Sequence, residues 1–391
     1  MSAPESRSTL TWRAGGWVVA GAALATLAVL GFALIGPLSG VRPVGDGRDP
    51  ATYGFELSGL ILPRAGLAAS GNPRDFLAPL DSPATMRGSE MVAHNAKRRG
   101  KYVVTGDRVI GVFVGGVARA YPLRLMNVHE VCNDEIAGIP IAVTYSPLTD
   151  SAVVFDRRVG DRVVTLGVSG LLYNSNTLYY DRGGEGHVPS LWSQLAFRAV
   201  AGPQAGTPLE LIPGVSVSNW GSWLMTHPET EVVMPAESDE RRMKSTSYER
   251  YWRDGRVEFP VVALEPAPNE RTKPIGAISV RTGALFEQEL PPMTYVMAVR
   301  RADDWVVVPL PEIVRLCLPP TGLAETSGFG APITWRGVPE QGAVVVSPPP
   351  NPVVIPCRWF AWNAFHPAPA DEPEAAGAAG AAPAAAVPAG N

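Results

Sequence analysis

Two short stretches of the sequence share an uncommon pattern, W-x-x-W-x-x-x-H-P, at residues 220–228 and 359–367. The chain has only ten Trp and five His residues, so agreement at four places indicates an internal repeat. Two stretches that precede them in the same order, residues 109–123 and 274–291, resemble each other as β-hairpins, with turns predicted at Gly115-Gly116 and Thr282-Gly283. The repeat therefore predicts a duplicated fold, with a first lobe at residues 100–236, a connector at 237–269 and a second, degenerate lobe at 270–367.

The repeated pattern has two interpretations. The i, i+3 spacing puts both Trp side chains on one helical face, and the His that follows four residues later shares this face. Such a face suits an aromatic platform for a ligand, and it equally suits a helix that closes the core of its lobe. Because the pattern occurs in both lobes and Trp strongly favours burial, we prefer the core interpretation.

The composition favours strands and turns over long helices. The chain contains 39 Pro and 40 Gly residues, which interrupt helices and favour turns. The apolar runs IPIAVTY (139–145), SAVVFD (151–156) and RVVTLGV (162–168) are typical of strands. We therefore predict a β-rich α+β fold of two related lobes, with mostly antiparallel strands and short helices.

The two ends differ from the middle. Residues 15–38 contain no charged side chain, and as a helix they would exceed the roughly 30 Å hydrocarbon core of a lipid bilayer. They predict a transmembrane anchor between a cytoplasmic leader at 1–14 and an extracytoplasmic linker and lead-in at 39–99. A cleaved signal peptide is the alternative, although the apolar run is long for one. The expected location is the cell membrane, with a single pass and most of the chain outside the cytoplasm. The Ala/Pro-rich end, residues 368–391, is predicted to be a disordered tail.

Charge and cysteine content argue against two classes of protein. The net charge is −4 and no basic stripe is interleaved with aromatic residues, so nucleic acid is not an expected partner. Three Cys residues allow at most one intramolecular disulfide, so the fold is expected to depend on its apolar core rather than on a disulfide framework.

Polar residues suited to a binding site gather in two stretches, NVHEVCND (127–134) and TYSPLTDS (144–151). Residues 123–133 have apolar positions compatible with a short helix, and the Ser-Pro-Leu-Thr turn at 146–149 separates two predicted strands. We expect the helix to face this turn across a partly open pocket. The candidate pocket residues are His129, Glu130, Asp134, Tyr145, Ser146, Thr149, Trp192 and Gln194.

The blocks ARAYPLRLMNVHEVCND, TYSPLTDSAVVFD, GVSGLLYNSNTLYYDR and SLWSQ carry a family resemblance. In this order they resemble the bacterial and archaeal domain-of-unknown-function family DUF3179 over about residues 50–367. The resemblance implies an exported or membrane-anchored protein, and it implies no particular reaction. In that family the turn usually reads Cys-Pro-Leu-Cys, whereas this chain has Ser146 and Thr149 there and keeps His129 at the position of the family histidine. It therefore implies the scaffold of a soft-metal or dithiol site without its sulfur atoms.

The first functional choice is a membrane-anchored extracytoplasmic binding or assembly protein, whose pocket holds a small ligand or a segment of a protein partner. The second is a soft-metal or redox protein that binds copper or zinc. On the predicted helix, Met126, His129 and Cys132 would form one stripe of soft ligands.

A hydrolase is the third choice. It would use His129 to activate Ser146 or Ser151, with Asp134 or Asp150 orienting the imidazole. Neither serine lies in a G-x-S-x-G nucleophile elbow, so an enzymatic role is not favoured.

Overall fold

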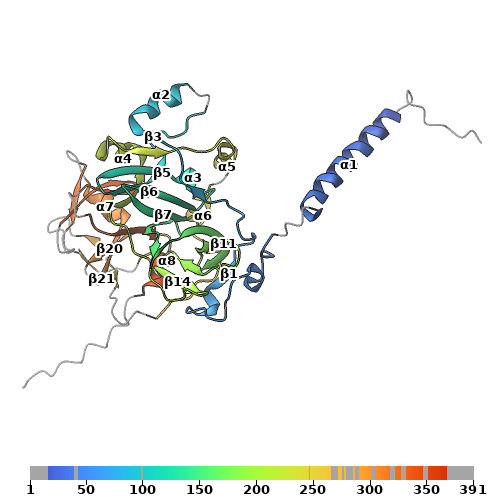
Figure 1. Cartoon of the computed structure of the whole chain (residues 1–391). Helices are drawn as coiled ribbons and strands as arrows, with labels where there is room; N and C mark the ends of the chain where they lie inside the picture. The colour runs from blue at the N-terminus through green and yellow to red at the C-terminus, as the bar shows by residue number, and fades with distance from the viewer. Residues whose placement is uncertain are drawn as a thin grey trace, which may run out of the picture.

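The chain folds into a β-rich α+β structure of mostly antiparallel sheets with short helices (Figure 1), as the composition predicts. This computed structural model describes residues 16–38, 43–97, 100–245, 247–265, 272–274, 277–278, 285–286, 290–301, 304–317, 322–326, 332–346 and 351–367.

Helix α1 (Gly16–Leu38) covers the uncharged stretch near the N-terminus. Within the described ranges, no helix qualifies as long and apolar enough to cross a membrane. The anchor therefore stays a prediction.

Eight strands form the largest sheet, in the order β22-β23-β24-β15-β4-β5-β16-β3. At its centre is the hairpin of β4 (Arg108–Val114) and β5 (Val117–Pro122), whose predicted turn at Gly115 and Gly116 has φ angles of 59° and 80°. Such positive φ angles favour glycine because it has no Cβ. The other strands are β3 (Thr85–Arg87), β15 (Val215–Asn219), β16 (Glu231–Val233), β22 (Ala324–Thr326), β23 (Ile333–Val338) and β24 (Gly342–Val345).

Two further sheets carry the polar blocks. The first has the order β2-β6-β7-β8, and its hairpin of β7 (Ile139–Ser146) and β8 (Ser151–Asp156) encloses the Ser-Pro-Leu-Thr turn. The second has the order β1-β11-β12-β13-β14, centred on β11 (Thr165–Tyr173) and β12 (Asn176–Arg182). Their remaining strands, with the small pair β9/β10, are β1 (Leu67–Ala69), β2 (Leu80–Asp81), β6 (Val131–Ile136), β9 (Arg158–Val159), β10 (Arg162–Val163), β13 (Leu191–Ser193) and β14 (Arg198–Ala201).

A four-stranded sheet from the later part of the chain (orange in Figure 1) completes the β structure. Its order is β17-β21-β20-β25, and β25 contacts β8 of the earlier part. Alternate residues of β20 enter two different apolar clusters, as the two-residue period of a strand requires. The sheet therefore packs between the two clusters. Its strands are β17 (Thr272–Pro274), β20 (Tyr295–Arg301), β21 (Asp304–Pro309) and β25 (Val354–Arg358).

A short antiparallel pair lies within residues 274–291, where the second hairpin is expected. It joins β18 (Ala277–Ile278) to β19 (Leu285–Phe286), and the predicted turn at Thr282 and Gly283 lies outside the described residues. The hairpin that leads through a Pro-Leu pair into a helix is instead β20/β21, followed by α7 (Leu310–Leu316). In the same way, β4/β5 leads into α3 (Leu123–Met126).

The helix predicted over residues 123–133 is too long. Helix α3 ends at Met126, and Val131 already begins β6, because residues 131–136 pair with β7. Cys132 thus lies on a strand and His129 in the turn before it, so the predicted stripe of Met126, His129 and Cys132 is not formed. The remaining short helices include α2 (Met91–Ala96), α5 (Asp239–Ser245) and α6 (Glu249–Asp254).

The W-x-x-W patterns form helices α4 (Trp220–Thr226) and α8 (Trp359–Phe365). Trp223 is 1% exposed and Trp362 0%, which confirms the core interpretation. The following histidines pack on these indoles, with ring centroids 4.1 Å apart for Trp223 and His227 and 4.3 Å apart for Trp362 and His366. Helix α4 contacts β15 and β4, and α8 contacts β25 and β20.

Candidate ligand-binding site

The two hydroxyl residues of the Ser-Pro-Leu-Thr turn are completely buried. Ser146 ends β7, Thr149 precedes β8, and both side chains are 0% exposed. The Ser146 hydroxyl accepts a hydrogen bond from the Thr177 backbone N–H at 3.0 Å, and the Thr177 hydroxyl donates to Glu130 Oε2 at 2.9 Å. Burial raises the pKa of Glu130 to about 7, with the Thr177 hydrogen bond acting in the opposite direction. The turn therefore faces a closed interior.

Thr149 belongs to the same interior cluster. Asn176 Nδ2 lies 2.9 Å from Thr149 Oγ1, 3.0 Å from Ser151 Oγ and 2.9 Å from Gln194 Oε1. Ser151 Oγ donates to Gln194 Oε1 at 2.5 Å, and Gln194 Nε2 donates to Thr144 Oγ1 at 2.9 Å. We call this set the buried polar network: Glu130, Thr144, Ser146, Thr149, Ser151, Asn176, Thr177 and Gln194.

The network joins two blocks that the sequence separates. Gln194 of SLWSQ reaches the turn as predicted, together with Asn176 and Thr177, which the sequence analysis did not select. Every member is at most 6% exposed. The partly open pocket predicted at this place is therefore a sealed core, because these side chains hydrogen-bond to one another.

The other predicted pocket residues make separate contacts. His129 is 4% exposed, its Nδ1 lies 2.6 Å from Ala78 O and its Nε2 lies 3.3 Å from Asp239 Oδ2. The latter pair is close enough for an ion pair but lacks the geometry of a hydrogen bond. His129 thus fixes the turn before β6 to other segments of the chain.

Asp134 and Trp192 also have structural partners. Asp134 Oδ2 accepts hydrogen bonds from Arg119 Nη1 at 2.8 Å and from Tyr121 OH at 2.6 Å. Trp192 Nε1 donates to Asp181 Oδ1 at 3.0 Å. These side chains are therefore occupied away from the turn.

The face of the turn opposite the buried polar network holds a charged cluster around Asp150. Asp150, which follows Thr149, is 0% exposed and has a φ angle of 47°. Its carboxylate accepts hydrogen bonds from Arg108 Nη1 at 3.0 and 3.2 Å, from Arg358 Nη2 at 2.8 Å and from Tyr145 OH at 2.8 Å. One aspartate thus holds an arginine at the start of β4 and an arginine at the end of β25.

Two aromatic rings enclose these arginines. The Cζ atoms of Arg108 and Arg358 lie 5.2 and 5.0 Å from the ring centroid of Tyr295, and 5.4 and 5.0 Å from that of Trp252. Such distances permit cation–π attraction. The indole N–H of Trp252 donates to Pro147 O at 2.8 Å, which ties α6 to the turn.

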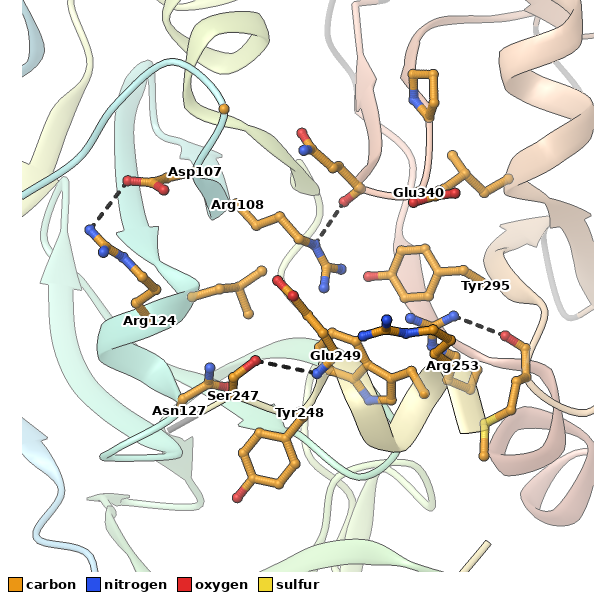
Figure 2. A pocket seen from close by; sticks show the side chains of 18 of the residues that line it. Asp107, Arg108, Arg124, Asn127, Ser247, Tyr248, Glu249, Arg253, Tyr295 and Glu340 are labelled. Atoms are coloured by element: carbon orange, nitrogen blue, oxygen red, sulfur yellow. Dashed lines mark hydrogen bonds and ion pairs between the residues drawn. The ribbon is translucent and has the colours of Figure 1, made fainter. Parts of the chain in front are cut away.

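The arginines line a cleft of about 1420 Å³ (Figure 2). Its walls come from β4 and α3 on one side, from β20, α7 and the end of β25 on the other, and from α5 and α6. Three acidic side chains line it: Asp107, Glu249 and Glu340. Six cationic side chains also line it: Arg108, Arg124, Lys244, Arg253, Arg315 and Arg358. The cleft is thus predominantly cationic.

The sequence analysis named Tyr145 as a pocket residue and Asp150 only as a possible partner of His129, and it missed the rest of the cleft. Asp150 lies inside the block TYSPLTDS, and Arg358 directly precedes the second W-x-x-W pattern. A charged residue next to each of two strong patterns was therefore the available signal. Among the residues that the structure describes, no group of three His, Cys, Asp or Glu side chains is arranged to hold a metal ion.

The comparisons with known proteins give one result. The family model described as "Protein of unknown function (DUF3179)" matches residues 83–315, which contain Arg108, Asp150, Trp252 and Tyr295. Arg358 lies beyond the match. No curated protein and no solved structure matches the chain. Because the match covers more than half of the sequence, the chain belongs to the DUF3179 family, as its sequence blocks predict.

Proposed function

We propose that this chain is a binding protein whose small ligand occupies the cleft beside the Ser-Pro-Leu-Thr turn. The observation that carries the proposal is the joint attachment of Arg108 and Arg358 to Asp150 at the cleft wall. Specific small-molecule sites combine a concave surface with a few fixed polar groups and aromatic walls. This cleft has all of these features.

The buried polar network supports the proposal because it holds the turn beside the cleft in one position. Its side chains fix the turn from one side, and the turn presents Asp150 on the other side. Ligand sites are more accurate when their residues are held by a supporting layer of packed and hydrogen-bonded groups. The turn is therefore a scaffold for the cleft, which replaces the predicted pocket around His129.

The hydrolase alternative is less favoured. Ser151 Oγ already donates to Gln194, Ser146 lies in the sealed network, and His129 bonds to Ala78. A nucleophilic serine requires a base within hydrogen-bond reach and access for the substrate.

The soft-metal or redox alternative is also less favoured. Cys132 is 0% exposed on β6, and burial raises the pKa of its thiol well above the ordinary value. A protonated, sealed thiol is a poor ligand for copper or zinc and a poor redox group.

The anchor and the location complete the proposal. Helix α1 would hold the protein in the bilayer, with the cleft outside the cytoplasm. Fractionation of cells should leave the intact chain in the membrane, and a mature N-terminus near residue 40 would instead indicate a secreted protein.

The two halves are proposed to descend from one duplicated unit. Each contains a hairpin that leads through Pro-Leu into a helix, and later a strand that leads into a W-x-x-W helix: β4/β5, α3, β15 and α4, and β20/β21, α7, β25 and α8. This origin explains why the cleft forms between them. Superposition of the units should bring Trp223 onto Trp362, and unrelated packing around these indoles would contradict it.

A thermal-shift screen tests the binding function. The full-length chain in mild detergent would be screened with amino acids, dicarboxylates, sugar phosphates, nucleotides and short peptides. Ser247→Trp should abolish the shift caused by any hit, because Ser247 is an exposed cleft residue and indole would fill the space. Ser58→Trp, at an exposed position away from the cleft, is the matched control. The proposed function would be overturned if the thermal shift caused by every hit were unchanged in Ser247→Trp, or if no compound caused a shift.

A further inference from the structure

Five buried polar atoms of cleft-lining residues have no hydrogen-bond partner among the described residues. Asn127 Oδ1 and Gln341 Oε1 are amide oxygens, and the other three atoms are Arg108 Nη2, Arg358 Nε and Tyr295 OH. The two guanidinium atoms carry N–H groups and the phenol carries an O–H group, so all three can donate. A buried polar group without a partner destabilises the protein. These three donors therefore lack an acceptor.

The three donors are close together. The guanidinium carbons of Arg108 and Arg358 lie 5.2 and 5.0 Å from the ring centroid of Tyr295. Figure 2 shows the Arg108 guanidinium and the Tyr295 hydroxyl pointing toward each other. Asp150 fixes both arginines, so one small acceptor would meet donors that are already in position.

The charges at this end of the cleft select the acceptor. Burial lowers the pKa of Arg108, but the Asp150 carboxylate raises it above the ordinary value overall, so this arginine remains charged. Burial raises the pKa of Tyr295, and the phenol therefore keeps its proton. Two guanidinium groups share the Asp150 carboxylate, and the cleft lining has six cationic against three acidic side chains, which leaves a positive excess. A water molecule would accept hydrogen bonds from these donors but would not neutralise the positive excess. An anion would do both.

The surroundings strengthen the attraction. Trp252 and Tyr295 lie over the guanidinium groups, and the side chains of Arg108 and Arg358 are only 15% and 13% exposed. Electrostatic attraction is stronger at such largely buried positions than in water. The cleft volume of about 1420 Å³ exceeds the space that one small anion needs. The anionic group is therefore one end of a larger organic molecule.

We propose that Arg108, Arg358 and Tyr295 form an oxyanion subsite, which binds the carboxylate or phosphate group of the organic ligand. This inference rests on the proposed function of the cleft. Arginine is well suited to the role because its planar N–H groups match both carboxylate and phosphate oxygens. Asp150 positions both arginines through its carboxylate.

Titration calorimetry of the full-length chain in mild detergent tests the subsite. The probes are inorganic phosphate and succinate, at constant ionic strength, with mannitol as the neutral probe. At least one anion should bind, mannitol should not, and the tighter anion identifies the phosphate or carboxylate class of the ligand.

Two variants locate the binding. Tyr295→Phe removes the unpaired hydroxyl and keeps the ring, and it should weaken anion binding about tenfold or more, because hydrogen bonds to charged groups are strong. Arg108→Lys keeps the charge but removes Nη2, and it should weaken binding in the same direction. Tyr173→Phe and Arg162→Lys lie away from the cleft and should leave binding unchanged.

The outcomes separate the two proposals. Anion binding that Tyr295→Phe leaves intact would overturn the subsite, as would the absence of anion binding. A neutral hit from the thermal-shift screen that Ser247→Trp abolishes would overturn the subsite and keep the cleft as the binding site. If neither anions nor screened compounds bind, both proposals fail.

Discussion

The two faces of the turn at residues 146–150 are both polar and both buried, but they differ in which of their polar groups have a hydrogen-bond partner. On the inner face, the hydroxyls of Ser146 and Thr149 join a network in which neighbouring side chains serve as one another's partners. On the cleft face, Asp150 is fully engaged while the arginines that it holds keep unpaired N–H groups. The inner face uses its polar atoms internally except for Asn176 Oδ1, whereas the cleft face holds several unpaired donors that a ligand can meet.

This difference separates polar groups that stabilise a fold from polar groups that recognise something else. A satisfied buried network fixes one conformation and has little left to offer a ligand. Unpaired buried donors destabilise the free protein and gain a partner when a ligand binds. Burial and polarity alone do not distinguish the two faces. The difference lies in the unpaired atoms, which are one amide oxygen, Asn176 Oδ1, on the inner face and three donors on two arginines and a tyrosine on the cleft face.

The largest expected effect comes from removing the charge shared by the cleft arginines. Asp150→Asn should lower the free energy of unfolding by about 3–5 kcal/mol, because it leaves two guanidinium groups without their buried counter-charge. Denaturant unfolding measures the loss. Asp161→Asn, at an exposed turn, is the control and should change stability by no more than about 0.5 kcal/mol. Equal effects of the two substitutions would contradict the role of Asp150.

On the inner face, Gln194→Ala should destabilise the protein by about 3 kcal/mol, because it removes the common partner of Thr144, Ser151 and Asn176. Gln204→Ala, at a half-buried surface position, should have a much smaller effect. Urea denaturation of both variants tests the difference. A mild effect of Gln194→Ala would mean that water molecules replace the lost hydrogen bonds. The inner face would then not depend on its own side chains, which contradicts the difference drawn between the two faces.

Glu130 gives the inner face a pH dependence. Its pKa is raised from 4.5 to about 7 by burial, so between these values the folded protein keeps a proton that the unfolded chain releases. The stability contributed by the neutral carboxyl is complete below about pH 4.5, falls as pH rises, and is lost above about pH 7, by at most about 3 kcal/mol. Glu130→Gln should remove this decline. The unfolding free energies of parent and variant, compared from pH 4.5 to 8, test it, and parallel curves would be inconsistent with a raised pKa.

The smallest effects compare two tyrosines on either side of the arginines. Tyr145→Phe removes a hydrogen bond to the charged Asp150 and should cost about 1.5–2 kcal/mol of stability. Tyr295→Phe removes a hydroxyl without a partner and should stay within about 0.5 kcal/mol of the ligand-free parent. Thermal unfolding resolves the pair. A loss at Tyr295 as large as that at Tyr145 would indicate that its hydroxyl is already bonded within the protein.

Much of the fold was predictable because its signals are local. Gly115 and Gly116 predicted a hairpin turn through their conformational freedom, and the spacing of Trp220 and Trp223 predicted a buried helical face. The error at residues 127–133 has a physical cause. Apolar residues there fit a helix locally, but pairing with β7 makes residues 131–136 a strand.

The cleft was not predictable in the same way. Arg108 and Arg358 stand far apart in the sequence and meet only because β4 and β25 bring their ends to Asp150. No local periodicity records such a contact. The sequence predicts a scaffold at this turn, and Pro147 and its neighbours do form one. It does not reveal which face of the turn borders the cleft.

A crystal structure of the full-length chain with the tighter of phosphate or succinate is the most direct test of the oxyanion subsite. The anion should lie within hydrogen-bond distance of Arg108 Nη2 and Tyr295 OH, with Asp150 still holding both arginines. An anion bound elsewhere, with these donors paired to groups of the protein, would contradict the assignment.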